Sequence, residues 1–412
     1  MTKTSRNAAV TTPTHSAETI ACNDDLLDEI LLRLPIKSLI RFKSVSKHWL
    51  SLISAPKFAL RRNPNPGPAS GLFLKRPFRP EFEFLNLDRT SESGATLRSL
   101  DFAAGDTFVG VGIVQSCNGL MLCSAQSVEP GDCYVYNPTI NRHRIIPPIP
   151  PARSGASRTV FGLSLAFDPS KSPHYSVVCV RSCDTRSDQY QLEVYSSETR
   201  RWRPSGGSFY VDSPDIRFDR GVFWNGSVHW ISIWGESVYF SVEEDRLRPM
   251  PMPPIPDDWD AESEYTYFGE SGGHLHLIDH IYNPHTPYFD VYELEKDYSG
   301  WLVKFRVDFS EFPAEAIRNR KSQPSNLHLH DYVFSLLCVV RSELDEESYL
   351  VLQIKGKVIR YYFRTRTFGK ICDVEGHRIK EPVRIRDSVL VMLPELPEWH
   401  DVHQFIESLA SV

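Results

Sequence analysis

The sequence predicts a small all-α unit of three helices followed by a large all-β domain. A six-bladed β-propeller is the favoured architecture for that domain, and a β-sandwich is the alternative. Apolar residues recur at helical spacing between residues 22 and 62. From residue 70 onward, short β-rich runs alternate with turn residues. A similar unit returns roughly every 46 to 59 residues, close to the ~40 to 50 residues of a propeller blade.

The composition excludes several classes of protein. Of the 412 residues, 41% are hydrophobic and 24% charged, which is ordinary for a globular protein with a core. The formal net charge of -6 argues against a nucleic-acid binder. No apolar run reaches the ~18 residues of a spanning helix, so no membrane association is expected. The eight cysteines, without a secretory signal, predict reduced thiols in the nucleus and/or cytoplasm.

The first predicted helix follows a Ser- and Thr-rich segment, residues 1–21, that we expect to be disordered. Asn23 offers an N-cap, and Asp24 and Asp25 suit the positive end of the helix dipole. Pro35 stops the helix. Four apolar residues at i, i+3, i+4 and i+7 lie on one face: Leu27, Ile30, Leu31 and Leu34.

Two further helices are predicted before a linker. One runs from about Lys37 to Val45, and Ser46 caps the next, which carries Trp49 and Ile53. Pro56 and the Pro-rich linker at residues 63–69 end it. Together the three helices hold more apolar residues than so small a core can bury, so some should face another protein or the next domain.

The segment from residue 22 to 62 resembles the F-box, especially its plant form. The resemblance covers the run from Asp24 to Leu39 and its continuation from Arg41 to Lys47, followed by Trp49. In one place the sequence departs from the family pattern. The family usually opens with Leu-Pro before the acidic pair, and here those positions hold Cys22 and Asn23.

The resemblance implies a Skp-type adaptor as partner and, through it, a cullin and a RING subunit. Eight residues are the candidates for the adaptor contact: Leu26, Leu27, Ile30, Leu34, Pro35, Leu39, Val45 and Trp49. Each could instead belong to the core of the helical unit. We expect Pro35 and the first-helix leucines mainly at the interface, and Phe42 and Ile53 mainly in the core. The segment from Ile30 to Pro80 holds eleven Lys or Arg and no Asp or Glu, which indicates either a solvated basic face or steering towards an acidic partner.

The all-β domain is predicted to span residues 70–412. Its repeated unit begins near positions 116, 162, 221, 272 and 331. Each unit has a first strand rich in small and apolar residues, such as Cys117–Leu122, then a Tyr-containing strand, a turn, and a basic or aromatic piece. A sixth, degenerate unit fits between Gly71 and Phe102, and the last residues are expected to complete a blade and close the ring, which removes exposed sheet edges.

Motifs in this domain resemble the plant F-box-associated domain. They are Ser116-Cys117-Asn118-Gly119-Leu120, Tyr136-Asn137-Pro138 and the run from Asn225 to Trp230. The resemblance implies a kelch-like propeller in the substrate-recognition subunit of a Skp–cullin–F-box ubiquitin ligase, which captures an unknown target protein for ubiquitination and degradation. Capture is expected through loops on one face. The candidate loops are residues 184–188, 257–265 and 283–288, with Asp184, Asp188, Trp259 and Tyr288 as candidate contacts.

No motif predicts catalysis, a cofactor or a metal. Gly162–Ala166 lacks the final glycine of a nucleophile elbow. The cysteine spacings do not form a zinc site, and His274 with His276 lack a third ligand at suitable spacing, so a packing or surface role is favoured. Two alternatives to the ligase subunit stay open: a scaffold that binds the adaptor without ubiquitin transfer, and a propeller enzyme such as a glycosidase with acids converging at its central channel.

Overall fold

The structure is a computed structural model that divides into two compact units, Met1–Pro64 and Asn65–Val412. It describes residues 20, 23–62, 67–76, 81–88, 96–100, 110–125, 132–151, 159–183, 189–211, 216–232, 236–252, 267–278, 288–308, 312, 334–354, 356–374, 384–385, 389–390 and 401–412.

The first unit is helical. Its helices are α2 (Asp24–Leu32), α3 (Ile36–Phe42), α4 (Lys47–Ser54) and α5 (Pro56–Arg62). The three-helix expectation was therefore one helix short in the described residues. Pro56 ends α4 as predicted but also opens α5, because a proline at the first position of a helix sacrifices no backbone hydrogen bond. The buried apolar residues of the unit include Leu27, Leu31, Leu39, Ile53 and Phe58.

The second unit is a six-bladed β-propeller, which confirms the predicted fold class. Each blade is a four-stranded antiparallel sheet. A separate short hairpin joins β24 (Arg384–Ile385) to β25 (Val389–Leu390). Blades 1 to 3 are, from the inner strand outward, β26 (Asp401–Phe405), β1 (Gly71–Lys75), β2 (Phe82–Asn86), β3 (Thr96–Arg98); β4 (Val111–Cys117), β5 (Leu120–Ala125), β6 (Cys133–Asn137), β7 (Arg142–Ile146); β8 (Val160–Ala166), β9 (Ser176–Ser182), β10 (Tyr190–Ser196), β11 (Arg201–Phe209).

Blades 4 to 6 follow the same order. They are β12 (Val222–Trp224), β13 (Ser227–Trp230), β14 (Ser237–Ser241), β15 (Arg246–Met250); β16 (Tyr267–Ser271), β17 (His274–Ile278), β18 (Tyr288–Leu294), β19 (Trp301–Asp308); β20 (Phe334–Val340), β21 (Tyr349–Ile354), β22 (Lys357–Tyr362), β23 (Thr367–Asp373). Two short 3-10 helices, η2 (Phe218–Arg220) and η7 (Asp345–Glu347), lie in the connections.

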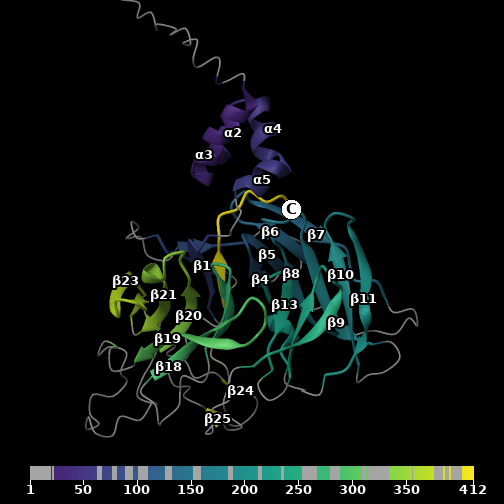
Figure 1. The fold of residues 1–412 in the computed structure, drawn as a ribbon, viewed down its shortest axis with the longest axis vertical. Coiled ribbons are helices and arrows are strands. Elements are labelled where there is room, and N and C mark those ends of the chain that lie inside the picture. The colour runs from purple at the N-terminus through teal and green to yellow at the C-terminus, as the bar shows by residue number, and fades with distance from the viewer. Residues whose placement is uncertain are drawn as a thin grey trace, which may run out of the picture. The chain divides into compact units, whose positions relative to one another are not determined.

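The ring is closed by a strand from the far end of the chain. The inner strands β4, β8, β12, β16, β20 and β26 contact one another in succession, and β26 contacts β4. In blade 1, β26 pairs antiparallel with β1, with Gly71 opposite Phe405 and Lys75 opposite Asp401. Figure 1 shows the yellow C-terminal strand beside β1. Through this pairing every inner strand has a blade on both sides, so the ring is closed.

The propeller has two different faces. Because every blade alternates strand direction, the turns between its first and second strands and between its third and fourth strands lie on one face, which we call the turn face. The connections between second and third strands and between blades lie on the opposite face, the loop face. The chain enters β1 from the turn face. Of the three segments predicted to bind the target, residues 184–188, 257–265 and 283–288, only Tyr288 lies among the described residues.

Tight turns on the turn face correct one expectation. Cys117–Leu122 was expected to be a strand, but Asn118 and Gly119 form a turn between β4 and β5, with φ of 46° and 90°. Asn225 and Gly226 form the equivalent turn in blade 4, with φ of 48° and 75°. Two consecutive positive φ values are the signature of a two-residue hairpin turn that Asn-Gly favours. In blades 2 and 4 the recurring Asn-Gly motif is therefore the hairpin turn between the two innermost strands.

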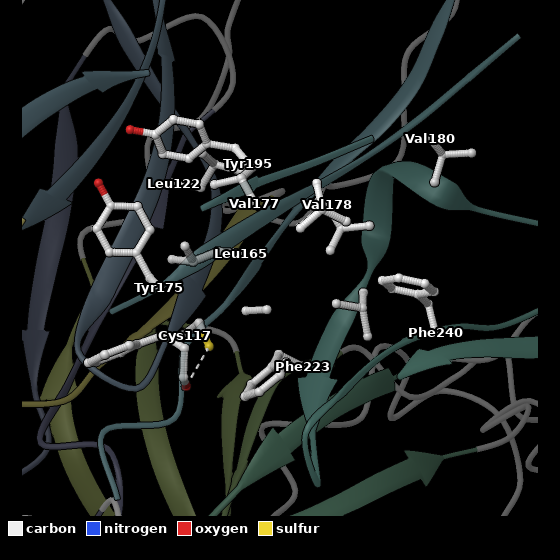
Figure 2. Packing of buried hydrophobic residues seen from close by; sticks show 14 of the residues in the cluster. Cys117, Leu122, Leu165, Tyr175, Val177, Val178, Val180, Tyr195, Phe223 and Phe240 are labelled. Atoms are coloured by element: carbon white, nitrogen blue, oxygen red, sulfur yellow. Dashed lines mark hydrogen bonds between the residues drawn. The ribbon is translucent and has the colours of Figure 1, made fainter. Parts of the chain in front are cut away.

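The hydrophobic core is distributed between neighbouring blades. One cluster joins blades 2, 3 and 4, and further clusters join blades 4 and 5, 5 and 6, 6 and 1, and 1 and 2. Figure 2 shows the first cluster, in which Leu122, Leu165 and Phe240 come from three different blades. Cys117 lies at its edge, where its thiol is 3.5 Å from the carbonyl oxygen of Phe167.

The residues after β26 pack back onto blade 2. The amide nitrogen of Asn137, a fully buried side chain at the end of β6, donates to the carbonyl oxygens of Ser408 and Ala410 at 3.1 and 2.8 Å. Leu409 and Ala410 are buried. Gly119 lies against this segment so closely that an added Cβ would be 2.4 Å from Cβ of Ser408. Asn137 and Gly119 belong to two of the motifs recognised in the sequence, and both hold the last residues in place.

Candidate functional site

The helical unit presents apolar side chains on two sides. Leu27 and Leu31, four residues apart, point into the core and are 3% and 0% exposed. Leu26 and Ile30, also four residues apart, are 44% and 45% exposed. Val45, in the turn between α3 and α4, is 60% exposed. The unit therefore fills its core and still leaves large apolar groups on its surface, which makes these groups a candidate interaction site.

The structure divides the eight candidate adaptor contacts into three groups. Leu26, Ile30, Pro35 and Val45 are exposed, and Leu34 and Trp49 are half-buried. Leu27 and Leu39 lie in the core, which corrects their expected place at a surface: each sits on the helix face that packs inward. Ile53 is buried as expected, whereas Phe42 is half-buried, 5.1 Å from Trp49 between ring centroids. Leu50, exposed beside Trp49 on α4, was missed.

Local capping fixes the ends of these helices. The side-chain oxygen of Asn23 accepts a hydrogen bond from the Leu26 backbone N–H at 3.2 Å. The Ser46 hydroxyl oxygen accepts one from Trp49 N–H at 3.1 Å. Asn23 stands where the F-box pattern has proline, and it supplies a side-chain cap that a proline lacks. The departure from the pattern thus has a local structural use at the start of α2.

The charged residues described in the helical unit include two groups, acids paired with arginine and basic residues without an ion pair. Arg61 of α5 donates to the carboxylates of Asp28 and Glu29 on α2 at 3.2 and 2.6 Å, so these acids are neutralised within the unit. Arg41, Lys47 and Lys57 are exposed and form no ion pair with any other described residue. Burial lowers the pKa of Lys43. The surface around α3 and α4 is therefore basic as well as apolar, which suits an acidic protein partner.

Only one of the candidate target contacts lies in the described part of the chain. Asp184, Asp188 and Trp259 lie outside it. Tyr288 begins β18, half-buried, with the Arg306 guanidinium 4.1 Å from its ring centroid. Arg306 also holds Asp290 through two hydrogen bonds of 2.7 and 2.8 Å. Tyr288 is therefore a strand residue packed under an arginine, at the edge of the loop face.

The histidine pair predicted to pack occupies an ionic cluster between blades 5 and 6. Nδ1 of His274 lies 2.7 Å from one carboxylate oxygen of Glu293, and Nε2 of the buried His276 lies 3.6 Å from the other. Arg341, near blade 6, approaches the same carboxylate at 3.4 Å. The hydrogen bonds and charges of the two histidines hold the pKa of Glu293 well below its usual range despite its partial burial.

The described residues set further limits on the chemistry. None of them form a group of three or more His, Cys, Asp or Glu side chains that could hold a metal ion. Burial raises the pKa of the Cys179 thiol to about 12, so this cysteine stays protonated and unreactive. Among the helices described, each falls short of the length and apolar character that crossing a membrane requires.

Comparison with known proteins identifies the family. The F-box domain family matches residues 22–61, and the F-box associated beta propeller domain family matches residues 85–259. F-box protein At5g07610 of Arabidopsis thaliana is 34% identical over 426 residues, which cover 96% of this chain and 94% of that protein. The chain belongs to the F-box proteins with an F-box-associated propeller.

Two further Arabidopsis relatives agree. F-box protein At5g49610 is 29% identical over 62% of this chain and 71% of its own length. F-box/kelch-repeat protein At3g17530 is 27% identical over 56% of this chain and 60% of its own length. An F-box joined to a propeller supports a substrate-receptor role in general terms. The F-box of this chain is the helical unit α2 to α5, and its exposed apolar side chains are the candidate site.

Proposed function

We propose that the F-box docks on a Skp-type adaptor and that the propeller presents a target protein to the cullin and RING subunits of the same ubiquitin ligase. The observation that carries the proposal is the apolar surface of Leu26, Ile30, Val45 and Pro35, which remains after the core of the unit has been filled. A small helical unit gains nothing by itself from apolar groups in water, whereas a partner that covers them gains their burial.

The exposed apolar side chains contribute measurably to docking. Complete burial of a leucine or isoleucine side chain contributes about 1.5 to 3 kcal/mol, so covering the exposed part of Leu26 or Ile30 contributes about 1 kcal/mol each. Basic residues around the surface add attraction at long range to an acidic partner, mainly by raising the association rate. Docking should therefore slow down as salt is added.

In this proposal the protein performs no bond chemistry itself. It raises the effective concentration of lysines of the target near the charged ubiquitin by tethering both in one complex. The target would be captured at the loop face of the propeller, which carries the long connections between strands and blades. The chain enters the propeller at the opposite, turn face.

The test is isothermal titration of the full chain with a purified Skp-type adaptor. The Leu26→Ala/Ile30→Ala double variant should weaken binding by more than tenfold, because it removes most of the ~2 kcal/mol that burial of the two side chains contributes to docking. A matched control is Leu344→Ala, since Leu344 is 64% exposed in the propeller. This control should bind like the parent, and circular dichroism should show that both variants are folded.

Equal binding by the parent and the double variant would refute the docking surface. Binding to the adaptor without cullin in the purified complex, or without an effect on turnover of any captured target, would favour the scaffold over the ligase subunit. These two measurements separate the proposed function from the alternative that shares its first step.

A further inference from the structure

A cavity of about 350 Å³ lies in the middle of the propeller. It is lined mainly by inner strands β4, β12, β16, β20 and β26 and by η2, which are far apart in the sequence. Its volume lies within the range of about 300 to 1,000 Å³ that small-molecule sites occupy. The centre of a propeller ring is therefore a concave site of its own, separate from the F-box.

The charged groups that line the cavity are mostly acidic. Three carboxyl groups stand against one guanidinium and one imidazole: Asp219, Glu270 and Asp401 against Arg220 and His403. Asp219 is already held by Arg217 through two hydrogen bonds of 2.9 and 2.8 Å, which lower its pKa. Asp401 interacts electrostatically with Lys75. Among the described residues, Glu270 feels only the charge of His274, which is itself paired with Glu293.

The Glu270 carboxyl group accepts one hydrogen bond from the backbone N–H of Gly273 at 2.7 Å and forms no ion pair with another described residue. Its side chain is mostly buried, and it lines the cavity. Within the same surroundings lie titratable groups from three inner or second strands: Tyr267 of β16, Cys117 of β4 and His274 of β17. His274 is itself engaged with Glu293.

Burial raises the pKa of Glu270 to about 7, although the Gly273 N–H and the charge of His274 act in the opposite direction. A carboxylate that is costly to ionise in a poorly solvated site is stabilised when a cation binds beside it. The site thus has a negative group and room for a ligand, and Glu270 forms no ion pair with another described residue.

We propose that the central cavity binds a small organic cation, an amine or guanidinium compound, which pairs with Glu270. A metal ion is not favoured, because the described residues offer no group of three ligands for one. An organic cation needs one carboxylate and hydrogen-bond acceptors, which the cavity provides. In a substrate receptor, such a ligand would lie inside the rigid ring, where it joins the inner strands of several blades.

The test uses agmatine and putrescine as probes, titrated calorimetrically into the full chain without adaptor. At pH 8 at least one probe should bind, and Glu270→Gln should weaken its binding by at least tenfold. Glu198→Gln is the matched control, because Glu198 is exposed in the turn after β10. Glutamine keeps the acceptor for Gly273 N–H, so the variant should remain folded.

Proton linkage gives a second readout. Both probes stay protonated between pH 6 and 8, whereas Glu270 with a pKa of about 7 is mostly neutral at pH 6. Binding should therefore be about tenfold weaker at pH 6 than at pH 8 and should release a proton near pH 7, as measured in buffers of different ionisation enthalpy. Glu270→Gln should abolish both effects.

Failure of both probes at millimolar concentration, or equal binding by Glu270→Gln and the parent, would overturn the proposal. The same titration with the Leu26→Ala/Ile30→Ala variant should be unchanged. If the probes do not bind the cavity, the adaptor proposal is unaffected, and if the adaptor does not bind the F-box, the cavity proposal is unaffected.

Discussion

Asn137 allows a quantitative test of how the ring is held closed. Its amide donates to the carbonyl oxygens of Ser408 and Ala410, and its side-chain oxygen accepts from Thr139 N–H at 2.9 Å. Replacing Asn137 by alanine removes these three bonds in a buried place. A net loss of about 1 kcal/mol for each bond gives about 3 kcal/mol of unfolding free energy.

This loss should be visible in two measurements. In a large domain, each kcal/mol of lost stability lowers the melting temperature by about 2 °C, so calorimetry should show a fall of about 6 °C. The backbone N–H groups of Ser408 and Ala410, which donate to Thr139 Oγ1 and Ser408 Oγ at 3.0 and 3.1 Å, should exchange with deuterium faster. Together they would show that the last residues depend on Asn137.

Asn86→Ala is the matched control. The side-chain oxygen of Asn86 accepts one local hydrogen bond, from Asp88 N–H at 2.9 Å. The control should lower the melting temperature by about 2 °C and leave exchange at residues 408 to 410 unchanged. If Asn137→Ala melts within 1 to 2 °C of the parent, the two carbonyl bonds contribute little and the reasoning is wrong.

Three further changes test other parts of the structure. Gly162→Ala should lower the urea midpoint of unfolding strongly, because its Cβ would lie 1.9 Å from the carbonyl oxygen of Phe218. The control Gly207→Ala should not, because nothing lies within 4 Å of its Cβ; equal midpoints for the two variants would contradict the packing. Glu270→Gln should become increasingly more stable than the parent from pH 5 to 8. The raised pKa of Glu270 means that its ionisation destabilises the fold above pH ~4.5. A difference in melting temperature that stays constant with pH would argue against this prediction. Arg61→Ala should reduce deuterium-exchange protection of α2 and α5 about fivefold, the equivalent of about 1 kcal/mol, and the effect should shrink at high salt, because Arg61 binds Asp28 and Glu29 at a half-exposed surface.

The sequence predicted the propeller because its repeats are physical units. The Asn-Gly pairs at 118 and 225 recur since blades 2 and 4 each have a two-residue turn between their two inner strands, and left-handed backbone is least costly there. The same pairs were misread as parts of strands because apolar residues flank them on both sides. Pro56 was read as a stop, although a proline can end one helix and begin the next.

The candidate docking surface was harder to predict. Helix α2 is apolar on two sides, so the spacing of Leu26 and Ile30 is the same as that of Leu27 and Leu31. Periodicity alone cannot say which pair packs inward; that depends on where α4 and α5 lie. Leu50 was not predicted for the same reason: spacing does not say that Leu50 is more exposed than its neighbour Trp49.

The central cavity left no local trace in the sequence. Glu270, Asp219 and Asp401 come from three separate elements and approach one another only when the ring closes. Nothing around Glu270 in the sequence distinguishes it from a solvated surface acid. Its unusual pKa arises from burial by other blades, which no spacing rule contains.

Closure by β26 has a consequence for the order of events during synthesis. Strand β1 leaves the ribosome early, but its partner Asp401–Phe405 follows more than 300 residues later. At ~5 to 20 residues per second, that interval lasts about 15 to 60 s. During this time the F-box can already fold and, under the proposed function, bind an adaptor, while blade 1 still exposes an unpaired edge. A nascent chain could thus enter a complex before it can select a target, and a chain cut short of residue 401 would never complete the ring.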